Sequence, residues 1–400
     1  MRWRFSLLMF LLYAPLGALI PLFTLRLQEL GFSPVAMGWC CATQSMAALV
    51  APLAAGQVAD RWLSAEKCLM VLAGLGGIFL WLLADLTEPI AVFSTSLAFW
   101  LVMAPTITLG AAVSFAHLPD PGRDFGLVRL WGTIGWVVAG WLVGYWLSVP
   151  GWSGWLGIEE TRIQFGDAFR VGGTFAFMLG LYATTLPHTP PQRAYAGWLA
   201  PWEALKRLHS RPFVVYWISV FGVCVIVPFT SQVTPLLLKH LGIPRSWLAP
   251  TLTIGQSTEV VSLAILPMLI IRLGVRGTML LGLMAWWWYL TALTLGQPTW
   301  LVISSISMNG LCICCFLVAG QVFVNSRAKA DIRASAQALV SFMSGFGMLV
   351  GHLLVGFVRR EVHENFRATF LVGAGIATVI VAIFGVGFPR DEAEERASRE

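Results

Sequence analysis

The sequence has few charged residues: they make up 12% of the 400 positions, against roughly 25% in an average soluble domain, whereas hydrophobic residues make up 57%. This shortage excludes a water-soluble fold. No segment clusters Lys and Arg densely enough to follow a phosphate backbone, so the net charge of +6 does not indicate a nucleic-acid partner. The seven cysteines lack the spacing of a disulfide framework or a metal motif. We therefore expect neither a metal nor a cofactor.

Apolar runs long enough to cross a bilayer recur along the whole chain. A transmembrane helix needs about 20 apolar residues, whereas a barrel strand has about ten residues of alternating polarity. The runs predict twelve helices, at residues 5–26, 36–58, 68–85, 90–116, 129–148, 168–187, 213–239, 249–271, 276–296, 299–325, 333–358 and 367–388. The first run resembles a signal peptide, but at about 22 residues it exceeds the usual apolar region of about 7 to 15. We predict an all-α membrane protein that retains this first helix.

The basic residues are distributed unevenly between the two ends of the predicted helices. If the N-terminus lies inside, 18 of the 26 Lys and Arg residues fall on inside ends and loops. Short cytoplasmic loops carry such an excess of Lys and Arg. The distribution therefore predicts a multi-pass protein with both termini in the cytoplasm.

A polar stretch with several prolines, from Leu186 to Pro212, separates six predicted helices from six others. It predicts an N-terminal half at 1–187, a cytoplasmic central loop at 188–212, a C-terminal half at 213–388 and a charged cytoplasmic tail at 389–400. Two six-helix halves around a central path are typical of secondary transporters, with the substrate site near the midplane. The alternative is an unrelated helix bundle whose cytoplasmic loops are basic.

Glu259 is the only one of the 20 acidic residues that falls in the middle of a predicted helix. A carboxylate at the bilayer centre costs about 2.5 to 3.5 kcal/mol on insertion scales, so it needs a partner, a cavity or a bound proton. Gln256 lies three residues earlier and Ser262 three residues later, so all three share one helix face. For Gln256, a hydrogen bond between packed helices is the structural alternative. An ionisable group is not needed for packing, so Glu259 indicates function.

A second polar face opens the predicted helix at 129–148, where Arg129, Thr133 and Trp136 recur at helical spacing. Together they offer a cation, a hydroxyl and an aromatic ring. The alternative for Arg129 is an arginine at a helix end that reaches into the interface. Asn309 begins a weaker polar face in the predicted helix at 299–325, and His352 stands alone, which favours a buried structural histidine over a proton carrier.

Four motifs resemble known transporters. The loop sequence GQVADRWLSAEK resembles the cytoplasmic loop motif of the major facilitator superfamily. The sequence RLWGTIGW, the pair Gln256 and Glu259, and the sequence IRASAQ resemble bacterial nucleoside:proton symporters over nearly the whole chain. The loop motif implies a conformational latch, with Gly56 at a close turn and Asp60 and Arg61 in ion pairs that switch between states.

The resemblance also implies a substrate site. Family members line a central cavity with the arginine, threonine and aromatic residue that match Arg129, Thr133 and Trp136, and with the glutamine and glutamate that match Gln256 and Glu259. A ribonucleoside offers hydroxyl groups to a carboxylate and an amide, and a base that can stack on an aromatic ring.

Some of the family's residues differ here. Counted without gaps from IRASAQ, the family's acidic residue falls at Cys314 and the aromatic beside it at Ile313, while a tyrosine of the family becomes Asn309. A glutamine and an asparagine of the family fall at Ile226 and Phe229. One wall of the predicted site is therefore changed.

We expect a secondary active transporter, not an enzyme: a monomer in the lipid bilayer that takes up a nucleoside by alternating access. A proton gradient drives it through Glu259. The alternatives are the same fold with another polar solute, such as a sugar, and an intramembrane enzyme or a sensor without a substrate. One mid-membrane carboxylate and a distant histidine do not supply the convergent groups that such an enzyme needs.

Overall fold

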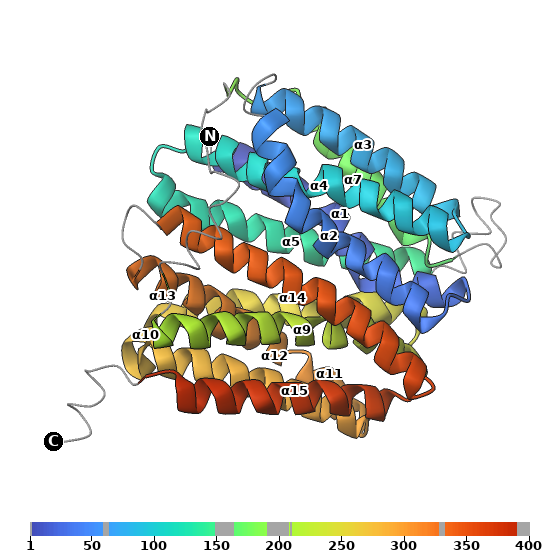
Figure 1. Cartoon of the computed structure of the whole chain (residues 1–400). Coiled ribbons are helices and arrows are strands. Elements are labelled where there is room, and N and C mark those ends of the chain that lie inside the picture. Colours follow the sequence, from blue (N-terminus) through green and yellow to red (C-terminus); the bar gives the residue numbers. More distant parts are fainter. Residues whose placement is uncertain are drawn as a thin grey trace. The chain divides into compact units, whose positions relative to one another are not determined.

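The computed structural model describes residues 2–58, 64–148, 164–189, 208, 210–327 and 333–389. All regular structure in these residues is helical (Figure 1), which confirms the all-α class. Before the predicted central loop the helices are α1 (Arg2–Glu29), α2 (Pro34–Val58), α3 (Ala65–Asp85), α4 (Pro89–His117), α5 (Pro121–Leu147) and α7 (Asp167–Ala183). After it follow α9 (Arg211–His240), α10 (Arg245–Leu295), α11 (Thr299–Ser305), α12 (Met308–Cys312), the π-helical segment η2 (Ile313–Val318), α13 (Ala319–Arg327), α14 (Arg333–Glu361) and α15 (Phe366–Gly387).

Within the described residues, nine helices are long and apolar enough to cross a membrane. One of them, α10, has 51 residues and contains both predicted helices at 249–271 and 276–296. It is interrupted at Gly274, whose φ of 67° lies outside the helical range and favours glycine. The predicted helix at 299–325 is also divided, because the backbone leaves the α-helical pattern after Ser305 and becomes π-helical over Ile313–Val318.

The start of α5 differs from the prediction. The expected helix begins at 129, but α5 begins at Pro121, so Arg129 lies about two turns inside the helix and not at its end. Proline suits the first turn because the missing N–H would have no partner there. Asp124 in the same turn pairs with Arg2 at 2.7 Å. Arg129 therefore does not lie at the end of its helix.

The chain forms two compact units. The first contains Met1–Tyr195 and also Pro235–Thr253, which covers the end of α9 and the start of α10. The second contains Ala196–Thr234 and Ile254–Glu400.

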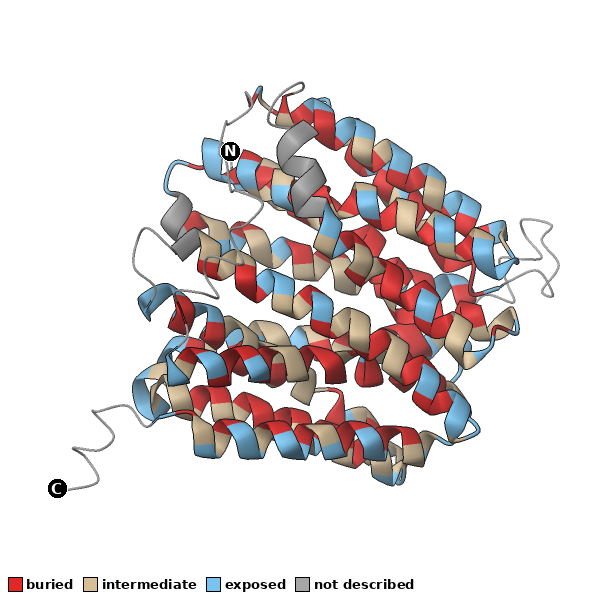
Figure 2. Cartoon of the chain, viewed as in Figure 1, coloured by how far each residue is buried: buried red, intermediate tan, exposed pale blue. Residues whose placement is uncertain are grey.

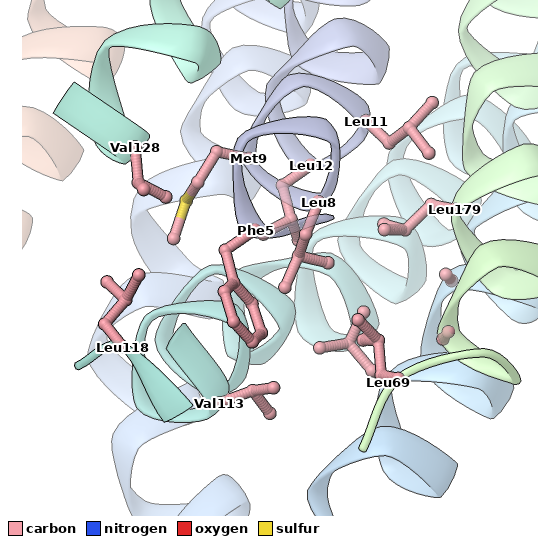
Figure 3. Packing of buried hydrophobic residues seen from close by; sticks show 13 residues of the cluster. Phe5, Leu8, Met9, Leu11, Leu12, Leu69, Val113, Leu118, Val128 and Leu179 are labelled. Atoms are coloured by element: carbon pink, nitrogen blue, oxygen red, sulfur yellow. The ribbon is translucent and has the colours of Figure 1, made fainter. Parts of the chain in front are cut away.

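In the first unit α1 lies at the core. Its apolar face packs with residues of α3, α4, α5 and α7, and Figure 3 shows Phe5 and Leu8 of α1 together with Val113 of α4 and Leu69 of α3. In the most apolar window of α1, 78% of the residues are buried, against 33% in α5. Because lipid is as apolar as leucine, close packing of side chains holds such helices together.

Polar side chains attach the segment Pro235–Thr253 to α1 of the same unit. The Nζ of Lys239 donates to Oε1 of Gln28 at 2.9 Å, and Arg245 pairs with Glu29 at 3.2 Å. Glu29 also accepts from the buried Arg26 at 3.0 Å and from the backbone N–H of Phe165 at 3.1 Å. A single carboxylate therefore serves three donors at this end of the unit.

In the second unit α9 is the most buried helix by the same measure, with 72% of its most apolar window buried, and most of it is coloured as buried in Figure 2. Phe316 of η2 lies edge-on to Phe384 of α15 and tilted against Tyr216 of α9. Gly282 of α10 lies against the backbone of η2, since a Cβ there would approach the Phe316 nitrogen to 2.7 Å. The π-helical segment is thus surrounded by packed helices.

Candidate functional site

The predicted polar face of α5 lies in the first unit, where Arg129, Thr133 and Trp136 are all half-buried. The Cζ atom of Arg129 lies 4.0 Å from the centre of the Tyr13 ring, which comes from α1. Sequence reasoning did not select Tyr13. The only signal in the sequence is a phenol group in the middle of an otherwise apolar first helix.

Glycines allow α1 and α5 to approach closely. A Cβ at Gly135 would overlap the backbone of Phe10, and one at Gly17 would lie 2.6 Å from the Cα of Trp136. Gly140 and Gly144 of α5 lie against Thr253 and Pro250 in the same way. The small residues of α5 serve helix packing.

Gln256 and Glu259 lie on α10 in the second unit and are half-buried. The loop between α11 and α12 is tied to this turn, because the Thr258 hydroxyl donates to the Ser307 carbonyl at 2.7 Å. A Cβ at Gly255 would lie 3.2 Å from the side chain of Asn309. The structure therefore brings Asn309 next to the turn of α10 that carries Gln256 and Glu259.

Gly310 makes the closest approach at this crossing. A Cβ at position 310 would overlap the backbone nitrogen of Glu259 and would lie 2.7 Å from the Thr258 carbonyl oxygen. The backbone that carries the carboxylate is thus in direct contact with α12.

Cys314, at the position of the family's acidic residue, is fully buried in η2. Its thiol is hydrogen-bonded to Cys315 and lies within electrostatic range of Glu259. The position that lacks the acid is therefore close enough to Glu259 to interact with its charge. π-Helical turns occur frequently at functional sites.

Thr253 and His352 have structural partners. The Thr253 hydroxyl donates to the Pro250 carbonyl at 2.7 Å and accepts from the Trp141 indole at 3.3 Å, and Thr253 belongs to the first unit. His352 is buried and its Nδ1 is hydrogen-bonded to the amide of Gln232, as expected of a structural histidine. Its Nε2 has no partner among the described residues.

The structure describes only part of the predicted conformational latch. Gly56 lies in the last turns of α2, and Asp60 and Arg61 lie outside the described residues. The ion pairs expected of Asp60 and Arg61 stay a prediction. Among the described residues no three His, Cys, Asp or Glu side chains form a group that could hold a metal ion.

The fold defines the class of protein. The structure superimposes on the crystal structure of the nucleoside transporter NupG with a TM-score of 0.83 and 25% identity, covering 98% of this chain and 99% of that one. The chain is thus a multi-pass membrane transporter with the fold of the major facilitator superfamily.

Sequence comparison narrows the class. Residues 1–393 match the family described as nucleoside H+ symporter, and the chain belongs to that family. It is 28% identical to the putative nucleoside transporter YegT of Escherichia coli K12, over 98% of this chain and 94% of the relative. It is 26% identical to the nucleoside permease NupG of the same organism, over 96% and 95%. The family resemblance predicted from the four motifs is confirmed.

Proposed function

We propose that this protein imports a nucleoside together with protons across the bacterial inner membrane by alternating access. The observation that carries the proposal is the match of residues 1–393 to the nucleoside H+ symporter family. Two relatives with names that specify nucleoside transport align over nearly their full lengths. The half-buried carboxylate of Glu259 supplies the group that takes up and releases the coupled proton.

Two groups of residues bind the substrate in this proposal. Trp136 offers a ring on which the base stacks, and Arg129 and Thr133 offer hydrogen-bond donors. Gln256, Glu259 and Asn309 offer an amide, a carboxylate and a second amide to the ribose hydroxyls. The packing of Gly255 and Gly310 supports the grouping of Asn309 with Gln256 and Glu259, because both glycines bring Asn309 close to α10.

The proposal includes twelve membrane spans, six on each side of the central loop at 188–212. The break at Gly274 supports it, because a straight helix of 51 residues would be about 77 Å long, far beyond the roughly 30 Å of a bilayer core. With 18 of 26 basic residues on the predicted inner side, both termini lie in the cytoplasm. A single cysteine in the central loop should resist a membrane-impermeant thiol reagent in intact cells and react after permeabilisation. Reaction in intact cells would mean that the protein has the opposite orientation in the membrane.

The transport proposal is tested with the purified protein in liposomes. With the outside more acidic than the inside, labelled uridine or adenosine should accumulate above its external concentration, and the recovered label should be chemically unchanged. An excess of unlabelled nucleosides should compete, and sugars should not. Competition by sugars alone would contradict a nucleoside as the substrate. A chemically altered product would indicate an enzyme. Equal uptake without the gradient would contradict proton coupling.

A further inference from the structure

Arg129 and Tyr13 form a cation–π pair between α5 and α1. The guanidinium carbon lies 4.0 Å from the ring centre, well inside the limit of about 6 Å for a cation–π interaction, and both side chains are half-buried. The described residues give the Arg129 guanidinium neither an ion pair nor a hydrogen bond beside this contact. Among the described residues, the ring face of Tyr13 is therefore the partner that stabilises the charge of the Arg129 guanidinium.

The backbone around the pair fixes its place. Gly132 follows Arg129 by one turn, and a Cβ there would lie 2.7 Å from Cδ2 of Tyr13 and 2.9 Å from Nη1 of Arg129. The two side chains thus occupy the space that the missing side chain leaves. Because Gly17 and Gly135 keep α1 and α5 in backbone contact, neither helix can move away without losing this packing.

A ring over the guanidinium carbon has a chemical consequence. Its five N–H donors all lie in the plane of the group, so an aromatic ring on the face leaves the donors at the edge available. A carboxylate partner would instead occupy two of these donors. An arginine paired in this way is suited to donate to neutral acceptors, such as the carbonyl oxygens of a nucleobase.

We propose that Tyr13 is a positioning residue of the substrate site, which holds the Arg129 guanidinium flat so that its edge donates to acceptor atoms of the base. This inference rests on the proposed function. It assigns Tyr13 to the ring face alone and does not require its hydroxyl group.

The test compares binding of labelled uridine and adenosine to purified variants. Tyr13→Phe keeps the ring, so Kd should stay within about twofold, whereas Tyr13→Leu should raise Kd about fivefold to tenfold, the range that corresponds to loss of a partly desolvated cation–π contact. Phe175→Leu, which also removes a half-buried ring from the first unit, is the matched control and should leave Kd unchanged. In an Arg129→Ala background, Tyr13→Leu should have no further effect.

A second pair of variants tests the geometry without changing either side chain. Gly132→Ala pushes a methyl group into the cation–π pair and should raise Kd as Tyr13→Leu does. Gly126→Ala on the same helix meets nothing within 4 Å and should not. Equal Kd values for wild type, Tyr13→Leu and Gly132→Ala, or additive effects of Tyr13→Leu and Arg129→Ala, would overturn the inference. Failure of wild type to bind either nucleoside would instead overturn the proposed function.

Discussion

Gly310 of α12 lies against the backbone nitrogen of Glu259 in α10, so closely that a methyl group at position 310 would overlap it. The position of the carboxylate thus depends on the absence of a side chain on a neighbouring helix. Neither helix can shift cheaply, because Thr258 also donates to Ser307 at this crossing.

Gly310→Ala should therefore lower both stability and transport. Overpacking of this kind costs about 1 to 3 kcal/mol, and the added methyl group must displace the turn that carries Glu259. Thermal unfolding in detergent and uptake per folded molecule measure the two effects. Gly375→Ala is the control, because a Cβ there meets nothing within 4 Å. Normal uptake by Gly310→Ala would mean that transport does not depend on the exact position of Glu259.

Glu259→Gln should abolish proton-driven accumulation but leave some exchange of substrate down its gradient. The amide keeps the size of the side chain and most of its hydrogen-bonding capacity, but it cannot carry the proton. Uptake into liposomes with and without a proton gradient, and exchange at equal pH, separate the two activities. Undiminished accumulation would mean that a group other than Glu259 couples transport to its energy source.

Cys314→Asp should steepen the response to the proton gradient. The thiol lies within electrostatic range of Glu259, so an aspartate there would add a second carboxylate within that range. Two close carboxylates cannot both ionise easily, and such a pair holds a proton more readily than one group alone. The initial rate of uptake as a function of external pH measures this. Cys315→Asp is the positional control. If the pH dependence of uptake by Cys314→Asp is unchanged, position 314 plays no part in proton coupling.

Glu29→Ala should destabilise the protein more than Arg245→Ala does. Arg26, at 4% exposure, loses a carboxylate partner in the first variant, and removing one partner of a buried pair costs up to about 3 to 5 kcal/mol. Arg245 is half exposed, and pairs of that kind contribute about 0 to 1 kcal/mol. Apparent melting temperatures in detergent rank the two variants. Equal losses would mean that Gln164 and the Ala84 carbonyl alone satisfy Arg26.

The helices were predictable from sequence because continuous apolar runs leave few other structures in a membrane. The polar faces of Arg129 with Thr133 and of Gln256 with Glu259 were predictable because helical spacing alone places their residues together. The start of α5 was missed because Arg123 and Asp124 lower the apolar character of its first turns. Proline at the first helical position and an aspartate three residues later are signals that favour the longer helix.

Contacts between distant segments were not predictable. Tyr13 and Arg129 lie 116 positions apart, and no sequence pattern states which side of α1 meets α5. The contact of Gly310 with Glu259 is of the same kind, since the pattern of α10 gives its polar face but not the neighbour that packs beside it.

The π-helical segment η2 has a consequence for how residues of relatives correspond to this chain. A π turn closes its hydrogen bond over five residues where an α turn needs four, so it contains one residue more. Between Cys314 and the IRASAQ motif, a relative with a regular α-helix would be one residue shorter. A gap placed inside η2 then matches the family's acidic residue to Ile313, which is half-buried, and not to the fully buried Cys314. An inserted residue of this kind turns the preceding side chains about the helix axis, so for a relative without a π turn the acid is equivalent in space to position 313, and Ile313→Asp is the companion variant to Cys314→Asp.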